Sequence, residues 1–152
     1  MAHPAFKDFY LVGGTSLALQ RGHRLSIDID LFTCVPYGEM NTSEIEAALL
    51  EMFTYTDRIE ELHNSQTVYS VYVASNKEVC VKLALCYDDD LIFPLIEVDG
   101  LRIASEKEIA AMKILAITQA EQRRKDFWDI HELLESYTLS EMIDWGVERY
   151  PW

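Results

Sequence analysis

The stretch Tyr10-Leu-Val-Gly-Gly-Thr-Ser-Leu-Ala-Leu, together with Leu25-Ser-Ile-Asp-Ile-Asp-Leu-Phe a few residues later, decides the fold. The apolar start of the first stretch predicts a short buried strand over residues 9–12, and the two glycines then open a helix over 15–21. The second stretch alternates apolar and polar residues and predicts a strand over 26–32. We therefore expect a strand, a tight glycine turn, a short helix and a second strand.

The second of these strands carries two carboxylates, Asp28 and Asp30. Residues two apart in a strand point to the same face, so these acids project together while Ile27, Ile29 and Leu31 point into a core. Two adjacent carboxylates repel one another unless a cation lies between them, and a pair of oxygen ligands suits Mg²⁺. A solvated Asp-x-Asp on a surface strand is the alternative, but the flanking apolar residues favour a metal site.

The composition is that of an acidic globular protein. With 152 residues, 49% of them hydrophobic, we expect a single domain over residues 1–152. Apolar runs stay short of the roughly 20 residues of a membrane helix, and residues 1–8 lack the basic and apolar regions of a signal peptide. The three cysteines form no disulfide framework, so we expect a cytoplasmic protein with no membrane and no disulfide-linked partner. The net charge of −13 disfavours non-specific binding of nucleic acid.

Beyond residue 32 the chain is predicted to form further strands and then helices. We expect a helix, three strand-like runs, a short hairpin around Asp99-Gly100 and finally three helices. In chain order these elements cover residues 43–53, 56–63, 67–74, 78–86, 95–103, 106–119, 124–136 and 139–148. A sheet-containing core over about 1–104 would thus be followed by a helical part over about 105–152.

Three local patterns add detail. Ser105 and Glu108 have the spacing of a capping box at the start of a helix. Asp88-Asp89-Asp90 looks like a metal-binding cluster, although a run of charges is more often a solvated turn. The helix over 124–136 has an apolar stripe that predicts its buried face, formed by Phe127, Ile130, Leu133 and Leu134.

The residues around the glycine turn are candidate anion-binding groups. Gly13-Gly14-Thr15-Ser16 follows a strand and opens a helix, which aims backbone N–H groups and the positive end of the helix at a phosphate. A plain turn between strand and helix is the alternative. Next along the chain, Arg21, His23 and Arg24 could hold a substrate phosphate or balance the acid pair, or simply lie in an exposed turn.

The C-terminal helices supply a second set of charged residues. Lys113 lies mid-helix among apolar neighbours, so its ammonium either reaches out to water or points into a polar site. Asp126 and Asp129 are spaced i and i+3 on one face of the next helix, directly after Arg123-Arg124-Lys125. Acids at a helix N-terminus are favoured by the helix dipole, so a purely structural role is the alternative to a role in a site.

Four pieces of the chain form one pattern. They are Leu11-Val-Gly-Gly-Thr-Ser-Leu-Ala-Leu, Gly22-His-Arg-Leu-Ser-Ile-Asp-Ile-Asp-Leu-Phe, Glu97-Val-Asp-Gly-Leu-Arg-Ile-Ala-Ser-Glu-Lys-Glu-Ile-Ala-Ala-Met-Lys and Arg124-Lys-Asp-Phe-Trp-Asp-Ile-His-Glu-Leu-Leu. In this order they resemble the AbiEii-type nucleotidyltransferases, many of which are toxins of bacterial abortive-infection and toxin–antitoxin systems. The resemblance spans nearly the whole chain, and the spacing from Gly-Gly-Thr to Asp-x-Asp resembles that of the nucleotidyltransferase superfamily.

This resemblance implies an α+β fold with a polymerase-β-like nucleotidyltransferase core, in which helices pack on a small mixed sheet. It also implies that Gly14 and the hydroxyl of Thr15 or Ser16 contact the phosphates of a nucleoside triphosphate. The expected nucleotide-binding set consists of Gly13, Gly14, Thr15, Ser16 and Arg24.

The same resemblance implies a catalytic set. Asp28 and Asp30 would hold Mg²⁺, with Mn²⁺ as a substitute, Lys113 would contact phosphate, and Asp126 would act as an acid–base group or organise the site. The implied acceptor is a hydroxyl of an RNA or of a protein, and the implied protein partner is a cognate antitoxin.

One departure from the superfamily leaves a second interpretation open. Superfamily members often carry a third carboxylate on a later core strand, and the corresponding run here, Val81-Lys-Leu-Ala-Leu, has Ala84 in that slot. The alternative is therefore a catalytically weak or inactive protein of the same fold that binds a nucleotide or a protein partner.

Overall fold

The computed structural model describes residues 3–59, 68–75, 79–119 and 123–151, and within them it contains a seven-stranded sheet, five α-helices and one 3₁₀ helix. The strands are β1 (Tyr10–Leu11), β2 (Ile29–Thr33), β3 (Tyr55–Arg58), β4 (Val68–Ala74), β5 (Val81–Tyr87), β6 (Ile96–Val98) and β7 (Leu101–Ile103). The helices are η1 (Pro4–Phe6), α1 (Gly13–Arg21), α2 (Thr42–Met52), α3 (Glu106–Thr118), α4 (Arg124–Leu133) and α5 (Leu139–Arg149). In the described part of the chain, no helix has the length and apolar character needed to cross a membrane.

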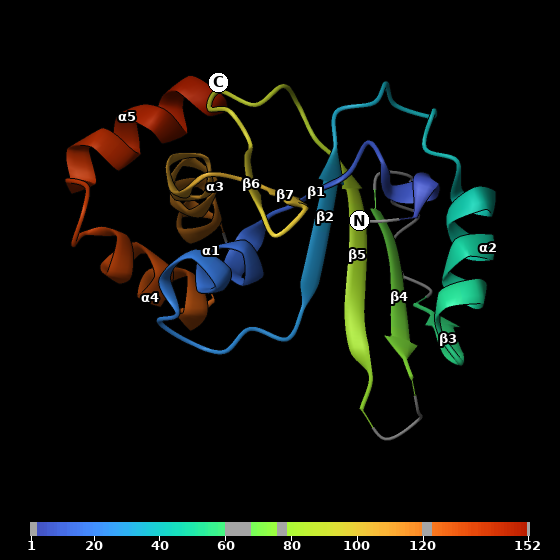
Figure 1. Ribbon diagram of the computed structural model, residues 1–152. Coiled ribbons are helices and arrows are strands. Elements are labelled where there is room, and N and C mark those ends of the chain that lie inside the picture. Colours follow the sequence, from blue (N-terminus) through green and yellow to red (C-terminus); the bar gives the residue numbers. More distant parts are fainter. Residues whose placement is uncertain (1–2, 60–67, 76–78, 120–122, 152) are drawn as a thin grey trace.

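The strands form a mixed sheet in the order β3-β4-β5-β2-β1-β7-β6, which confirms the expected α+β class (Figure 1). Strand β2 pairs in parallel with β5, and β1 pairs in parallel with β7, whereas the other pairs are antiparallel. Strand β3 lies at the edge, as its polar sequence predicts, although residues 60–63 of the expected strand lie outside the described residues. In the β2–β5 pair Asp30 lies directly opposite Ala84, so this alanine occupies the neighbouring strand's position beside the acid.

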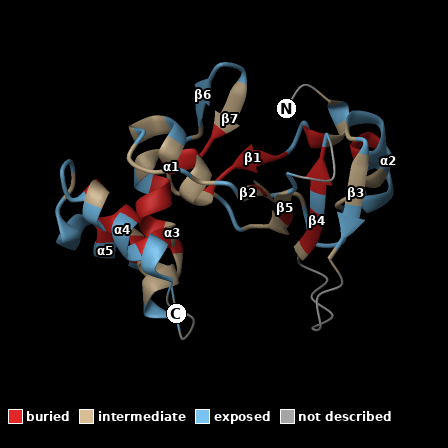
Figure 2. Cartoon of the chain, turned by 90° about the horizontal axis from the view of Figure 1, so that it is seen from below, coloured by how far each residue is buried: buried red, intermediate tan, exposed pale blue. Residues whose placement is uncertain are grey.

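Two apolar cores cover the two faces of the sheet. The core around Leu31 and Leu83 packs against η1 and α2, and the core around Tyr10 and Val12 packs against α1, α3, α4 and α5. Figure 1 shows α2 on one side of the strands and the other four α-helices on the opposite side. In Figure 2 the buried residues gather in the strands and in the helices packed next to them. Because Asp30 alternates with Leu31, its side chain belongs to the face covered by α1, α3, α4 and α5.

The strand that carries the acid pair is shorter than the sequence predicts. Strand β2 begins at Ile29, Asp28 precedes it, and Ile27 is 76% exposed, so the expectation that Ile27 points into the core is wrong. The cause is a contact with α1 that replaces strand pairing. The Thr15 hydroxyl donates to the backbone carbonyl of Asp28 and also bonds to the Ser26 hydroxyl, at 2.8 Å.

The buried face of α4 also differs from the apolar stripe. Ile130 and Leu133 are buried as expected, but Phe127 and Leu134 are each 46% exposed. The other buried residues of this helix are the two carboxylates Asp126 and Asp129. Periodicity alone cannot predict this rotation of the helix, because the acids are buried through ion pairs with distant basic residues.

A buried ion cluster links α5 to the sheet. Nη2 of Arg149 lies 2.6 Å from Oδ2 of Asp88, and Nε of Arg149 lies 2.7 Å from Oε1 of Glu108, although the latter angle does not suit a hydrogen bond. The Tyr10 hydroxyl also donates to Asp88, at 2.8 Å. Asp88 is therefore a buried acid held by Arg149 and Tyr10 and is not a solvated turn residue, and it belongs to no metal-binding group among the residues that the structure describes.

The N-terminus of α3 also differs from the capping box that the sequence predicts. The Ser105 hydroxyl accepts from the N–H of Glu108, as a capping box requires. The Glu108 carboxylate, however, accepts from the N–H of Phe93 at 2.9 Å and faces Arg149, so the reciprocal half of the predicted box is replaced by the ion cluster.

Candidate active site

The glycine turn lies between β1 and α1. Gly13 has a left-handed backbone with φ of 67°, and a Cβ on it would lie 2.8 Å from Oδ2 of Asp30. A Cβ on Gly14 would overlap Nη2 of Arg24. The two glycines therefore let a carboxylate and a guanidinium approach the start of α1, where the first N–H groups of a helix have no partner within it.

The two hydroxyls of the turn face different surroundings. Thr15 bonds to Ser26 and Asp28 and so positions the residues that lead into the acid pair. Ser16 is fully buried, and its hydroxyl lies 3.2 Å from the backbone carbonyl of Ala104, to which it donates. Thr15 thus lies beside the acid pair, whereas Ser16 faces the interior behind it.

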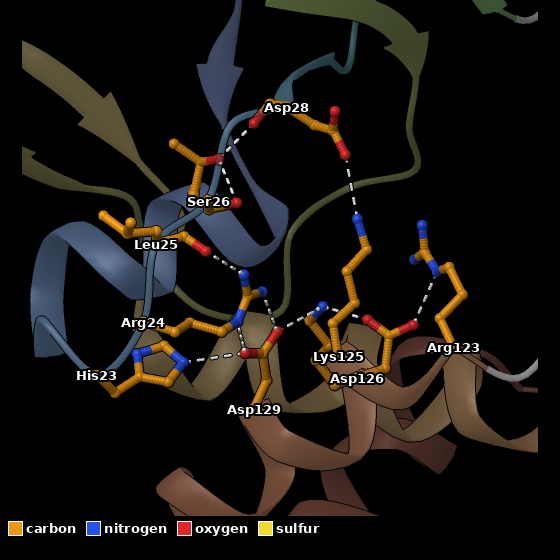
Figure 3. Close-up of polar contacts among 11 residues, drawn as sticks. His23, Arg24, Leu25, Ser26, Asp28, Arg123, Lys125, Asp126 and Asp129 are labelled. Atoms are coloured by element: carbon orange, nitrogen blue, oxygen red, sulfur yellow. Dashed lines mark hydrogen bonds and ion pairs between the residues drawn. The ribbon is translucent and has the colours of Figure 1, made fainter.

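The acid pair concentrates negative charge next to this turn. Burial raises the pKa of Asp30, and the nearby charge of Asp28 raises it further, while Lys125, Arg123 and Lys113 act in the opposite direction. Asp28 is 38% exposed and forms an ion pair with Lys125, with 3.1 Å between Oδ2 and Nζ (Figure 3). The pair is therefore a partly buried site of like charges that a cation would stabilise.

Asp129 is the centre of a buried ion cluster on α4. Its Oδ1 lies 2.9 Å from Nε2 of His23 and 2.6 Å from Nε of Arg24, and its Oδ2 lies 2.8 Å from both Nη2 of Arg24 and Nζ of Lys113. Burial alone would raise the pKa of Asp129, but hydrogen bonds from Arg24, Lys113 and His23 outweigh it and lower the pKa to about 2. The same hydrogen bond to Asp129 raises the pKa of the Arg24 guanidinium.

Asp126 extends this cluster toward the protein surface. Its carboxylate, which is 1% exposed, forms an ion pair with Lys113 and lies 2.9 Å from Nε of Arg123. Lys113 is itself 6% exposed and lies between the two acids of α4. Neither Lys113 nor Asp126 is a solvated side chain, so their burial must be explained by a structural or a chemical role.

The structure brings the predicted residues from four elements together. The Asp30 carboxylate lies beside Gly13, and the Arg24 guanidinium lies over Gly14. Lys125, in the first turn of α4, forms an ion pair with Asp28 (Figure 3). The predicted residues in this assembly are Gly13, Gly14, Thr15, Arg24, Asp28, Asp30, Lys113 and Asp126. Arg21 lies elsewhere, with its guanidinium on Glu106 at 2.6 Å.

The sequence leaves three contacts of this assembly unassigned. Asp129 bonds to His23 and to Arg24, and Lys125 bonds to Asp28, across sequence separations of 97 to 106 residues. The exposed-turn alternative for His23 and Arg24 is wrong, because their partner is a buried carboxylate. The spacing of Asp126 and Asp129 is the signal that could have indicated their shared burial, since residues i and i+3 lie on one helical face.

The donor set fits a divalent ion that is completed by substrate. In the described ranges no group of three or more His, Cys, Asp or Glu side chains could hold a metal ion. Mg²⁺ needs no such group, because it is usually bound through one or two carboxylates, water and substrate phosphates. The Asp30 carboxylate lies beside Gly13 at the start of α1, and the Asp28 carboxylate pairs with Lys125, so two carboxylates and basic side chains are present as such a complex requires.

The chain matches a family described as "Nucleotidyl transferase AbiEii toxin, Type IV TA system" over residues 1–150. It is 30% identical to an uncharacterised protein of Aquifex aeolicus strain VF5 over 143 residues, which are 86% of this chain and 59% of that protein. JHP933 from Helicobacter pylori has a TM-score of 0.60 at 25% identity, and the match covers 88% of this chain and 60% of JHP933. MenT4, a nucleotidyltransferase toxin from Mycobacterium tuberculosis, has a TM-score of 0.59 at 14% identity, with 92% and 55% covered.

These likenesses confirm the expected nucleotidyltransferase fold. The chain spans about three fifths of the length of the Aquifex protein and of JHP933. Because the family match extends over almost all of the sequence, the chain belongs to the AbiEii nucleotidyltransferase toxin family.

Proposed function

We propose that this chain is a Mg²⁺-dependent nucleotidyltransferase that transfers a nucleotide from a nucleoside triphosphate to a hydroxyl of an RNA or a protein. The observation that supports it most is the position of Asp28 and Asp30 beside the glycine turn and a cluster of basic side chains. In a chain with a net charge of −13, four of the 13 Lys and Arg residues lie around this pair, namely Arg24, Lys113, Arg123 and Lys125. The carboxylates of Asp28, Asp30, Asp126 and Asp129 balance these four cations, so the site repels an anionic substrate less than the rest of this acidic chain does, and a divalent cation would make it positive.

In this proposal the acid pair and the glycine turn bind the triphosphate. Asp28 and Asp30 hold Mg²⁺, for which Mn²⁺ can substitute, and Gly13, Gly14 and Thr15 present the first backbone N–H groups of α1 to the phosphates. When bound, the divalent ion lowers the pKa of the attacking hydroxyl and stabilises the leaving pyrophosphate. The acceptor hydroxyl gives up its proton to solvent water, and its oxygen forms a bond to the α-phosphorus. The bond from the α-phosphorus to the oxygen that bridges to the β-phosphate breaks, and pyrophosphate leaves with that oxygen.

The residues of α3 and α4 arrange the charge around that reaction. Lys113 stays paired with Asp126 and Asp129, and its charge lies close enough to lower the pKa of Asp30, so it acts on the site as a fixed charge. The Asp126 carboxylate is already bonded to Lys113 and Arg123, which supports the organising role for this residue over the acid–base role. Arg24 lies over Gly14 and is fixed by Asp129, so it closes one wall of the nucleotide site.

The biological part of the proposal follows from the family. We propose that the chain acts in the cytoplasm as a toxin and is opposed by a cognate antitoxin, which the type IV toxin–antitoxin description of the family supports. The net charge of −13 makes non-specific RNA a poor acceptor, so an RNA acceptor would have to be recognised at the site itself.

The test is nucleotide transfer from each of the four α-labelled nucleoside triphosphates in the presence of Mg²⁺ and a bacterial extract. The expected result is label on an RNA or protein band from at least one triphosphate, and no label when EDTA replaces Mg²⁺. Substituting the exposed Asp144 on α5 by Ala provides a control that changes an acid away from the site and should leave transfer unchanged. If no triphosphate gives label, the proposed activity is wrong.

The position of Ala84 opposite Asp30 favours the second candidate, a protein that binds nucleotide without turnover. This alternative predicts that a nucleoside triphosphate raises the melting temperature while the transfer assay stays blank. Transfer that depends on the metal would exclude it.

A further inference from the structure

Four basic side chains surround the acid pair, and they differ in how firmly they are held. Arg24 donates two hydrogen bonds to one buried carboxylate, and Lys113 lies between two buried carboxylates with 6% of its side chain exposed. Lys125 is 41% exposed and meets a carboxylate that is 38% exposed. Its ammonium ends a flexible four-carbon chain, so Lys125 is free to change partner at little cost, whereas Arg24 and Lys113 are not.

The partner of Lys125 is itself significant. Its Nζ lies 3.1 Å from Oδ2 of Asp28, one of the two proposed metal ligands, and the two residues are 97 positions apart in the chain. Figure 3 shows the side chain reaching from the first turn of α4 to this carboxylate. An ammonium and a divalent cation compete for the same oxygen, because each is stabilised by the same negative charge.

We propose that Lys125 is a movable counter-ion of the site, and this inference rests on the proposed function. Without metal, its ammonium neutralises Asp28 and reduces the repulsion between Asp28 and Asp30. When a divalent ion binds the Asp28 carboxylate, the Lys125 ammonium is released and binds the triphosphate that arrives with the metal. Lys125 is therefore a competitor of the metal and a ligand of the phosphates, two roles that a purely structural ion pair would not combine.

These two roles predict changes of opposite sign in the variant Lys125→Gln. Removal of a competing, partly exposed ion pair should make Mn²⁺ bind about two- to fivefold more tightly when no phosphate is present. Loss of a charged hydrogen-bond donor should make inorganic triphosphate bind about tenfold more weakly in the presence of saturating Mn²⁺. The side chain is partly exposed, so the variant should keep the melting temperature of the wild type.

The experiment uses the full chain with Mn²⁺ alone and then with inorganic triphosphate. The EPR signal of free Mn²⁺ measures metal affinity, and calorimetry measures triphosphate affinity. Arg124→Gln is the matched control, because it removes the same charge from the neighbouring, exposed position of α4. The Mn²⁺ affinity of Arg124→Gln should stay within about twofold of the wild type, because this variant keeps the ion pair between Lys125 and Asp28.

Three results would overturn the inference. They are unchanged or weaker Mn²⁺ binding by Lys125→Gln, equal tightening in Arg124→Gln, and unchanged triphosphate binding by Lys125→Gln. The variant Asp30→Ala separates this failure from that of the proposed function. If Asp30→Ala abolishes Mn²⁺ binding, the metal site stands whatever Lys125→Gln does; if it has no effect, the proposed function fails and the inference with it.

Discussion

The substitution Asp129→Asn tests whether the buried ion cluster on α4 holds the site together. The Asp129 carboxylate accepts hydrogen bonds from Nε and Nη2 of Arg24 and also contacts Nε2 of His23 and Nζ of Lys113. All four nitrogen–oxygen distances are 2.9 Å or less. The variant keeps the size of the side chain but removes the negative charge, so Arg24 loses its counter-ion and Lys113 keeps only Asp126. The contacts therefore change while the packing volume does not.

The structure sets the size of the effect. The pKa of Asp129 falls from 3.8 to about 2, and at about 1.4 kcal/mol for each unit this amounts to roughly 2 kcal/mol of stability at neutral pH. Removing one partner of a buried ion pair costs about 3–5 kcal/mol, and the remaining carboxylate of Asp126 favours the lower end. We expect a loss of about 3 kcal/mol, a large share of the roughly 5–15 kcal/mol typical of a whole domain.

The assay is urea unfolding at pH 7, with Asp144→Asn on the exposed side of α5 as the control. The same measurement at lower pH checks the electrostatic origin. Because the folded-state pKa of Asp129 lies below its unfolded value, its stabilisation is present above about pH 4 and is lost as the pH falls toward about 2. The stability gap between wild type and Asp129→Asn should narrow over that interval. A gap below about 0.5 kcal/mol at pH 7, or one that does not depend on pH, would refute the reasoning.

Two further substitutions test other parts of the structure. Gly13→Ala should cost about 1–3 kcal/mol more in urea unfolding than Gly38→Ala, because both glycines have positive φ but only a Cβ on Gly13 meets Asp30, at 2.8 Å; equal losses would contradict the close approach. Arg149→Met should cost about 3–5 kcal/mol, because it leaves the buried carboxylates around Asp88 without their cation; a thermal melt within about 2 °C of the wild type would show that the cluster contributes little.

The local part of the fold could be predicted from the sequence. The strand–glycine–helix sequence, the acid pair and the hairpin at Asp99-Gly100 all depend on near neighbours, and each has a recognisable residue pattern. The resemblance to the nucleotidyltransferase superfamily indicated Ala84 as the slot of a third carboxylate, and this residue lies opposite Asp30 in the sheet.

What could not be predicted depends on contacts between distant residues. The apolar stripe of α4 predicts Phe127 and Leu134 as core residues, whereas Asp126 and Asp129 are buried instead. Their partners lie on α3 and on the segment before β2. Ile27 was misplaced because Thr15 holds the residues before β2 away from the sheet. The ion pairs of Asp126 and Asp129 and the hydrogen bond of Thr15 join residues far apart in the chain and leave no periodic pattern. The sequence therefore shows these residues but not their partners.

The central claim is that Asp28 and Asp30 hold the divalent ion of a bound nucleoside triphosphate. Its most direct measurement is Mg²⁺-dependent label transfer by the double variant Asp28→Asn and Asp30→Asn, compared with the wild type at equal concentrations of folded protein. We expect the wild type to transfer label and the double variant to transfer none above the level seen with EDTA. Transfer by the double variant at the wild-type rate would contradict it.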